Sequence, residues 1–150
     1  MRLPLRLVTL GLLSFATSGF VQPKAVAATA APEEKMITMR IDQQPFTLVP
    51  ADNAASRALM KQLPLSVEMH ELNGNEKFTD LTFSLPVGPV VTGEINAGDV
   101  MLYGTHTLVL FYRSFQTSYR YTRIGRIAHP ETLEQHAGMK AAKISVTLSP

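Results

Sequence analysis

The chain has 150 residues, the length of a single domain, and its 45% hydrophobic and 17% charged residues are typical of a globular protein. It contains no cysteine, which excludes disulfides, thiolate zinc sites, a cysteine nucleophile and a lipid-modified cysteine. Residues 1–31 hold three of the fourteen basic residues and none of the twelve acidic ones, so the remainder carries a formal charge of −1. This balance argues against a nucleic-acid partner, which would need a surplus of Lys and Arg on the folded domain.

The N-terminal segment has the order of features that is typical of a secretory signal. Arg2 and Arg6 form a positive start, and residues 7–21 form an uncharged, mostly apolar run. Small residues follow in two triplets, 25–27 and 28–30, each of which fits the rule for signal cleavage. The apolar run has about 15 residues, fewer than the roughly 20 that a transmembrane helix needs.

We therefore expect a cleaved signal peptide over residues 1–27, with Ala27 as the preferred cleavage site and Ala30 as the second. A flexible leader over 28–35 would then precede one domain over 36–150. The alternative is that the N-terminal segment forms a helix or strand of the core. A cleaved signal implies an exported protein, periplasmic or extracellular, that is not integral to the membrane after signal removal.

The rest of the chain is predicted to form short strands and two short helices. Apolar and polar residues alternate along most strands, whereas residues 107–112 are nearly all apolar and predict a strand buried on both faces. Asp52 or Asn53 is expected to cap the first helix and Pro130 to begin the second. Residues 76–92 are less regular. The predicted strands are 36–41, 46–49, 65–72, 100–103, 107–112, 121–127 and 144–148, and the helices end at Pro64 and Gly138. This order of elements predicts a mostly β fold, a closed or nearly closed β-barrel with two short helices.

Motifs of the common enzyme classes are absent. There is no nucleotide-binding glycine motif, no phosphate-binding loop and no Gly-x-Ser-x-Gly turn. The four histidines are not spaced as metal ligands, so neither a metal nor a cofactor is expected. Glu76 and Asp80 could lie close together, but solvation or an ion pair with Lys77 is the expected role.

One stretch is distinctive, because no acidic residue lies between Asp99 and Glu131. It holds four arginines and six of the eleven Phe and Tyr residues. On an alternating strand Tyr119, Tyr121 and Arg123 share a face, which predicts a pocket wall where aromatic rings supply apolar area and an arginine binds a carbonyl or carboxylate. The alternative is that the aromatic rings fill the barrel and the arginines pair with acids such as Glu68 and Asp80. The candidate ligand-binding residues are Arg113, Phe115, Tyr119, Tyr121 and Arg123.

Several segments, taken in order, resemble a bacterial cyclophilin-like family. The match covers about residues 36–148 and implies a compact cyclophilin-type β-barrel with two helices, with no specific activity attached. The segments are DN at 52–53, RAL at 57–59, LPL at 63–65, NGNEK at 73–77, AGDVMLYG at 97–104, LVLFYRSF at 108–115, TSY at 117–119 and YTRIGRI at 121–127.

The resemblance to active prolyl isomerases ends at the fold. Those enzymes carry Phe-His, a Gly-Gly-containing segment and a Trp in the proline pocket, and this chain has none of the three. We therefore expect an exported, non-enzymatic module that binds a peptide or small molecule. The alternatives are an atypical isomerase built on Arg113 or Arg123, and a structural partner domain in the cell envelope.

Overall fold

The computed structural model of the chain describes Gly19 and residues 35–150. The signal peptide expected over 1–27 and the leader expected over 28–35 lie outside the described residues, except for Gly19 and Lys35, and both stay predictions. The strands are β1 (Ile37–Ile41), β2 (Gln44–Pro50), β3 (Leu65–Leu72), β4 (Glu76–Asp80), β5 (Val90–Ile95), β6 (Asp99–Tyr103), β7 (Thr107–Phe111), β8 (Phe115–Ile127) and β9 (Lys143–Ser149). The helices are α1 (Ala54–Met60) and α2 (Leu133–Ala137). No helix in this part of the chain is long and apolar enough to cross a membrane.

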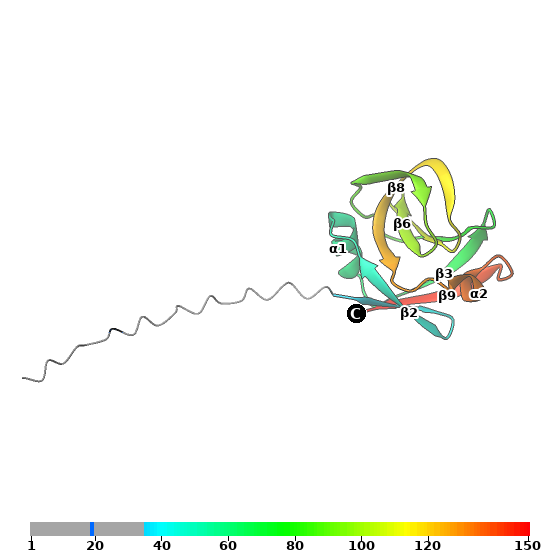
Figure 1. Cartoon of the computed structure of the whole chain (residues 1–150), viewed down its shortest axis with the longest axis horizontal. Coiled ribbons are helices and arrows are strands. Elements are labelled where there is room, and N and C mark those ends of the chain that lie inside the picture. Colours follow the sequence, from blue (N-terminus) through cyan, green and yellow to red (C-terminus); the bar gives the residue numbers. More distant parts are fainter. Residues whose placement is uncertain (1–18, 20–34) are drawn as a thin grey trace, which may run out of the picture. The chain divides into compact units, whose positions relative to one another are not determined.

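The strands form an antiparallel ring (Figure 1). The order around it is β2, β1, β9, β3, β4, β7, β6 and β8, and the pairing of β2 with β8 closes it. β5 pairs with the first half of β8 and lies outside the ring. The mostly β fold with two short helices that the sequence predicts is therefore confirmed.

The main hydrophobic core fills the interior of the ring. Its side chains come from sequence-distant strands, because alternate residues of every strand point inward. Met39, Leu48, Met69, Leu110 and Leu148 have no exposed surface. Leu110 lies in the apolar run that the sequence predicts to be buried on both faces.

Both helices add their apolar faces to this core. Asn53 caps α1, since its Oδ1 accepts a hydrogen bond from the Ser56 amide at 2.8 Å. The Asn53 amide group also donates to the Arg123 carbonyl oxygen at 2.7 Å, which holds the start of α1 against β8. The buried apolar side chains are Ala55 and Leu59 of α1 and Leu133 and Ala137 of α2, spaced four apart in each helix.

A tight turn joins β3 to β4. Asn73 and Gly74 have positive φ angles of 57° and 72°, the conformation that Asn and Gly adopt at least cost. The turn is the one that the sequence predicts at this Asn-Gly pair.

Two strands occur where the sequence pattern predicts none, and a third begins earlier than predicted. β4 and the first half of β5 fall in the stretch of residues 76–92, and β8 begins at Phe115, not at Tyr121. β4 carries the sequence EKFTD, in which apolar and polar residues do not alternate as they do in a typical half-buried strand. Its Lys77 is fully buried on the inner side, so the polar residue there finds its partners only in the folded domain.

Candidate functional site

A cleft lies on the outer face of the sheet formed by β4, β7, β6 and β8. Along β7, Leu108 and Leu110 belong to the main core, whereas Val109 and Phe111 belong to a second, smaller cluster on the opposite face. The cavity has a volume of about 580 Å³, within the roughly 300–1,000 Å³ typical of small-molecule sites. Its lining residues are Leu72, Asn73, Glu76, Phe78, Asp80, Tyr103, Thr107, Val109, Phe115, Gln116, Thr117, Ser118, Tyr119 and Tyr121.

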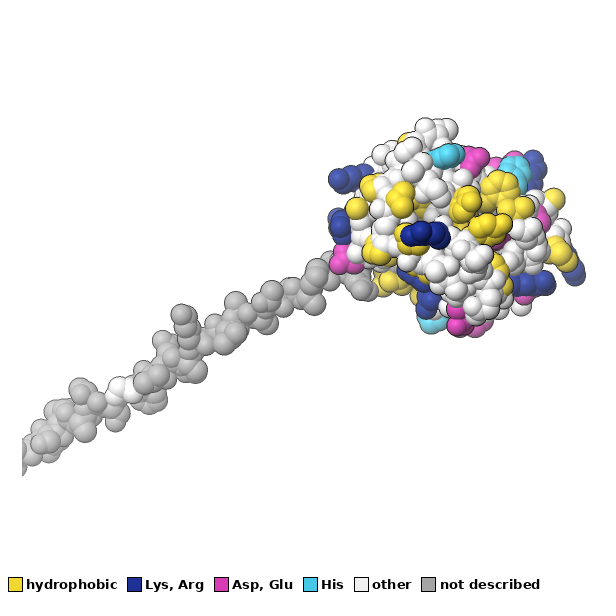
Figure 2. Space-filling model, turned by 90° about the horizontal axis from the view of Figure 1, so that it is seen from above, with side chains coloured by type: hydrophobic (Ala, Val, Ile, Leu, Met, Phe, Trp, Pro, Cys, Tyr) yellow, Lys and Arg dark blue, Asp and Glu magenta, His cyan; other side chains and the backbone are white. Residues whose placement is uncertain are grey.

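Aromatic rings form much of the cleft wall. Tyr103 of β6 lies 5.8 Å from Tyr121 and 6.1 Å from Tyr119, both of β8, measured between ring centroids. Tyr121 is buried and packs edge-on against Phe111, whereas Tyr119 is 61% exposed at the rim. Seen from the β8 end of the domain, apolar side chains gather on the surface with a basic side chain among them, and most other charged side chains lie toward the edges (Figure 2).

Glu76, the first residue of β4, places a carboxyl group in this cleft. Its side chain lines the cavity, and the residue is only 6% exposed. No described residue forms a hydrogen bond or ion pair with the Glu76 carboxylate. Burial, together with the negative charge of Glu71, raises the pKa of Glu76 to about 7. The cleft therefore holds a carboxyl group that can be charged or neutral near neutral pH.

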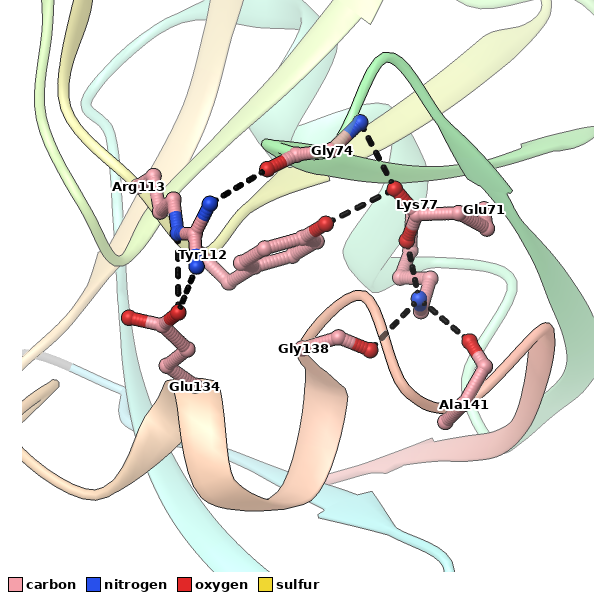
Figure 3. A network of polar contacts seen from close by, with 8 residues as sticks. All are labelled: Glu71, Gly74, Lys77, Tyr112, Arg113, Glu134, Gly138 and Ala141. Atoms are coloured by element: carbon pink, nitrogen blue, oxygen red, sulfur yellow. Dashed lines mark hydrogen bonds and ion pairs between the residues drawn. The ribbon is translucent and has the colours of Figure 1, made fainter.

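The next residue, Lys77, points to the opposite side of β4 and is fully buried there (Figure 3). Its ammonium group forms an ion pair with Glu71. It also donates hydrogen bonds to the carbonyl oxygens of Gly138, at 3.0 Å, and Ala141, at 2.6 Å. These contacts join β4 to the segment between α2 and β9. The prediction for Glu76, solvation or an ion pair with Lys77, is therefore wrong, because Glu76 is buried and alternation along the strand directs the two side chains to opposite faces. Asp80 is exposed, in line with the solvated role expected for it.

Glu71 is the anionic centre of this buried network. Its carboxylate accepts hydrogen bonds from the Tyr112 hydroxyl at 2.7 Å and the Gly74 amide at 2.8 Å, besides the Lys77 ion pair (Figure 3). Burial raises the pKa of Glu71, but the hydrogen bonds and the Lys77 charge outweigh it and hold the pKa below its usual value. Burial also raises the pKa of Tyr112, and so does its bond to Glu71.

Three of the five residues that the sequence singles out lie together in the cleft. Phe115, Tyr119 and Tyr121 all come from β8 and line the cavity. Burial and the charge of Glu76 raise the pKa of Tyr121 to about 12, so its hydroxyl stays neutral at physiological pH. A role of these rings in binding a ligand stays a prediction.

Arg123 lies outside the cleft and pairs with a buried acid. Its guanidinium donates to Asp99 at 2.9 Å, as does that of Arg126, and Asp99 is fully buried. The second Asp99 oxygen accepts from the Asn96 amide at 2.9 Å. A bulge explains the convergence, since Met101 pairs with Arg123 but Val100 pairs with Gly125, which leaves one extra residue on β8.

Arg113 also lies outside the cleft lining, in the connection between β7 and β8. Its guanidinium pairs with Glu134 of α2 and donates to the Gly74 carbonyl oxygen at 3.3 Å (Figure 3). The acids that bind these arginines are thus Asp99 and Glu134, and not Glu68 or Asp80. The arrangement fits the alternative in which the arginines have structural partners, while the aromatic residues remain at the cleft.

The cleft residues that are not among the sequence-based candidates come from β3, β4, β6, β7 and β8 and from the turn before β4. Glu76, Phe78 and Asp80 are spaced two apart, so they share the face of β4 that looks into the cleft. The sequence already indicates that Glu76 and Asp80 could lie close together, and the spacing of these two acids around a phenylalanine is the signal that could have placed them in the cleft. Within residues 35–150 the structure has no group of three or more His, Asp or Glu side chains that could hold a metal ion.

Comparison with known proteins identifies the family. A search of the curated proteins found no match, and neither did a search of the solved structures. The family model described as the cyclophilin-like family matches residues 39–149, which is nearly the whole described domain. The chain therefore belongs to the cyclophilin-like family.

Proposed function

We propose that the domain is an exported binding module whose cleft captures a short peptide segment or a small molecule. The cleft has the size of a ligand site and combines aromatic walls with a few polar groups, the composition that such sites usually have. The aromatic rings would supply apolar contact area, and the polar groups would orient the ligand.

The observation that carries this proposal is the unpartnered carboxyl group of Glu76. A buried carboxylate is costly unless it is paired, and the same domain pairs its other buried acid, Asp99, with two arginines. A carboxyl group that lines a cavity and has no partner among the described residues is available to a ligand. Strongly shifted pKa values in a cleft are a general mark of functional sites.

The cleft chemistry favours binding over prolyl isomerisation. An isomerase must stabilise the twisted amide better than the planar one, for which a cationic donor to the proline nitrogen is the minimum equipment. Among the described residues that line the cleft there is no Arg, Lys or His. Arg113, the arginine nearest in sequence to Phe115, is engaged by Glu134.

A peptide titration followed by NMR tests the proposal. Acetylated and amidated tripeptides that sample the side-chain classes, including proline, are added to the domain. At least one class should shift the amide signals of Gln116, Thr117 and Tyr119. The Tyr119→Ser variant should weaken that binding, whereas the Met139→Ser variant, which truncates an equally exposed apolar side chain outside the cleft, should not.

Two outcomes would contradict this proposal. One, which would contradict peptide binding, is that no tripeptide shifts the cleft signals at about 10 mM, since a Kd above that concentration corresponds to negligible affinity. The other is fast exchange between the cis and trans signals of the proline peptides. Uncatalysed exchange takes tens to hundreds of seconds, so cross-peaks within about one second would favour the isomerase.

A further inference from the structure

We propose that the cleft selects a ligand that carries an organic cation, an alkylammonium group whose charge lies against Glu76 and the tyrosine rings. The inference rests on the proposed function and names the class of ligand. It depends on three features of the cleft, which are its unpartnered acid, its lack of basic residues and its aromatic walls.

The first feature is the distribution of ion pairs around the cleft. Lys77, the neighbour of Glu76 in sequence, already pairs with Glu71, and Arg113 pairs with Glu134. The two arginines near the bulge of β8 share Asp99. Glu76 is thus a buried acid to which the described part of the chain supplies no cation. A positively charged ligand group would remove this imbalance.

The second feature is the sign of the charge in the cleft. Glu76 and Asp80 are its titratable acids, two strand positions apart on the same face of β4, and no described basic side chain lines the cavity. The Asp80 carboxylate accepts a hydrogen bond from the Thr107 hydroxyl at 2.7 Å, which orients it at the exposed end of β4. Two acids without a counter-charge attract cations and repel ligand carboxylates and phosphates.

The third feature is the aromatic wall. The faces of tyrosine and phenylalanine rings attract cations within about 6 Å of the ring centroid. The ring centroid of Tyr103 lies 6.1 Å from that of Tyr119 and 5.8 Å from that of Tyr121. A small ammonium group near one of these rings therefore lies near a second. Recognition of ammonium groups by several rings and one acid is a recurring solution in proteins.

A neutral ligand is the competing possibility. With a pKa of about 7, the Glu76 carboxyl could instead stay protonated and donate a hydrogen bond to a ligand carbonyl. A ligand cation would favour the ionised form of Glu76, whereas a carbonyl would favour the protonated form. Charge-matched probes therefore separate the two.

The test compares charged and neutral probes of equal shape, by NMR titration at about pH 8, where Glu76 is mostly ionised. One pair is N-acetyl-lysine N-methylamide and its norleucine analogue, and the other is n-butylammonium and 1-butanol. Each cation should bind at least about tenfold more tightly than its neutral match, the effect expected of a charged hydrogen bond. Tighter binding of the lysine probe would identify a peptide side chain as the source, and tighter binding of butylammonium a free amine.

The Glu76→Gln variant should lose this preference by about tenfold, because Gln keeps the shape and removes the charge. Glu94→Gln is the matched control, since Glu94 is exposed on β5 and does not line the cleft. Equal binding of charged and neutral probes, or unchanged lysine binding in Glu76→Gln, would overturn the cation inference while leaving the cleft a binding site. Absence of any shift with both cations would also overturn it, and the tripeptide titration then decides the proposed function separately.

Discussion

Glu76 and Lys77 are neighbours in sequence with opposite surroundings. Lys77 is fully buried, yet one carboxylate and two carbonyl oxygens satisfy its ammonium group. Glu76 is almost as buried and has no such partner among the described residues. The two side chains differ because adjacent residues of a strand face opposite sides of the sheet.

The first prediction concerns Glu76 and pH. Its pKa rises from 4.5 in the unfolded chain to about 7 in the folded domain, so the folded state keeps the proton over that range while the unfolded state loses it. The free energy of unfolding should therefore fall as pH rises from about 4.5 to about 7 and stay level above. Glu76→Gln removes this fall. The variant should match the wild type near pH 4.5 and be more stable by about 1–3 kcal/mol near pH 8.

Urea denaturation at several pH values measures this difference. Glu94→Gln is the control, because Glu94 is exposed on the neighbouring β5. Glu71 is held ionised by its partners, and Tyr121 stays neutral, so neither changes charge between these pH values. The other titratable side chains that line the cleft are Asp80, Tyr103 and Tyr119. All three are present in both the wild type and the Glu76→Gln variant. A Glu76→Gln variant that is no more stable than wild type near pH 8 would contradict the prediction.

At the scale of elements, the bulge of β8 determines what Arg123 does. It brings Arg123 and Arg126 to the same buried carboxylate, that of Asp99. Regular alternation would give Arg123 the face of Tyr121 and give Arg126 the opposite one. The bulge adds a residue, so Ile124 and Ile127 both reach the main core although they are three apart.

The second prediction follows from this shared acid. Arg123→Ala should destabilise the domain by about 1–3 kcal/mol, because Asp99 loses one charged hydrogen bond and keeps the other. The Arg123→Ala/Arg126→Ala double variant should lose more than the sum of the two single losses, since it leaves a buried charge without a cation. Thermal melting of the two single variants and the double variant measures these losses of stability.

Arg120→Ala serves as the control for this series. Arg120 is an exposed arginine of β8 with no ion pair among the described residues, and its removal should change stability by less than about 0.5 kcal/mol. A double variant that melts like the wild type would contradict the prediction and show that water stabilises the Asp99 carboxylate without the arginines. Because Arg123 acts through Asp99, none of these variants should change binding in the cleft.

At the scale of the whole molecule, the third prediction is export. A bacterium that expresses the chain with its native N-terminus should release a protein that starts near Ala28 into the periplasm or the medium. N-terminal sequencing and mass measurement identify the start. Leu13→Arg, which places a charge in the apolar run, should retain the intact chain in the cytoplasm. Wild-type protein found soluble in the cytoplasm with residues 1–31 intact would refute the prediction.

The ring is built from pairings between distant parts of the chain. β1 pairs with β9, and β2 pairs with β8, so the closure joins the two ends of the domain. Lys77 likewise bonds to carbonyl oxygens more than 60 residues away. These contacts position β4, and with it Glu76, only once the whole ring has formed.

The sequence by itself determined the features that depend on neighbouring residues. The apolar run of β7, an N-cap of α1 at Asp52 or Asn53 and the Asn73-Gly74 turn all follow from local spacing and local hydrogen bonding, and the structure selects Asn53 as the cap. The ordered set of segments along the chain also identified the cyclophilin-like family. The aromatic residues of β8 could be identified from the sequence, because their high local frequency is visible in the composition of that stretch.

Only the tertiary structure decided which polar residue faces the cleft and which arginine meets an acid. β4 is too polar to be recognised as a strand, because its inward lysine is satisfied by groups from β3 and from the segment after α2. Arg123 and Asp99 are 24 positions apart and meet through the pairing of β6 with β8. Periodicity in the sequence indicates whether a side chain lies on the apolar or the polar face of a strand. The residue that it contacts on that face comes from a distant segment, and closure of the ring determines which segment that is.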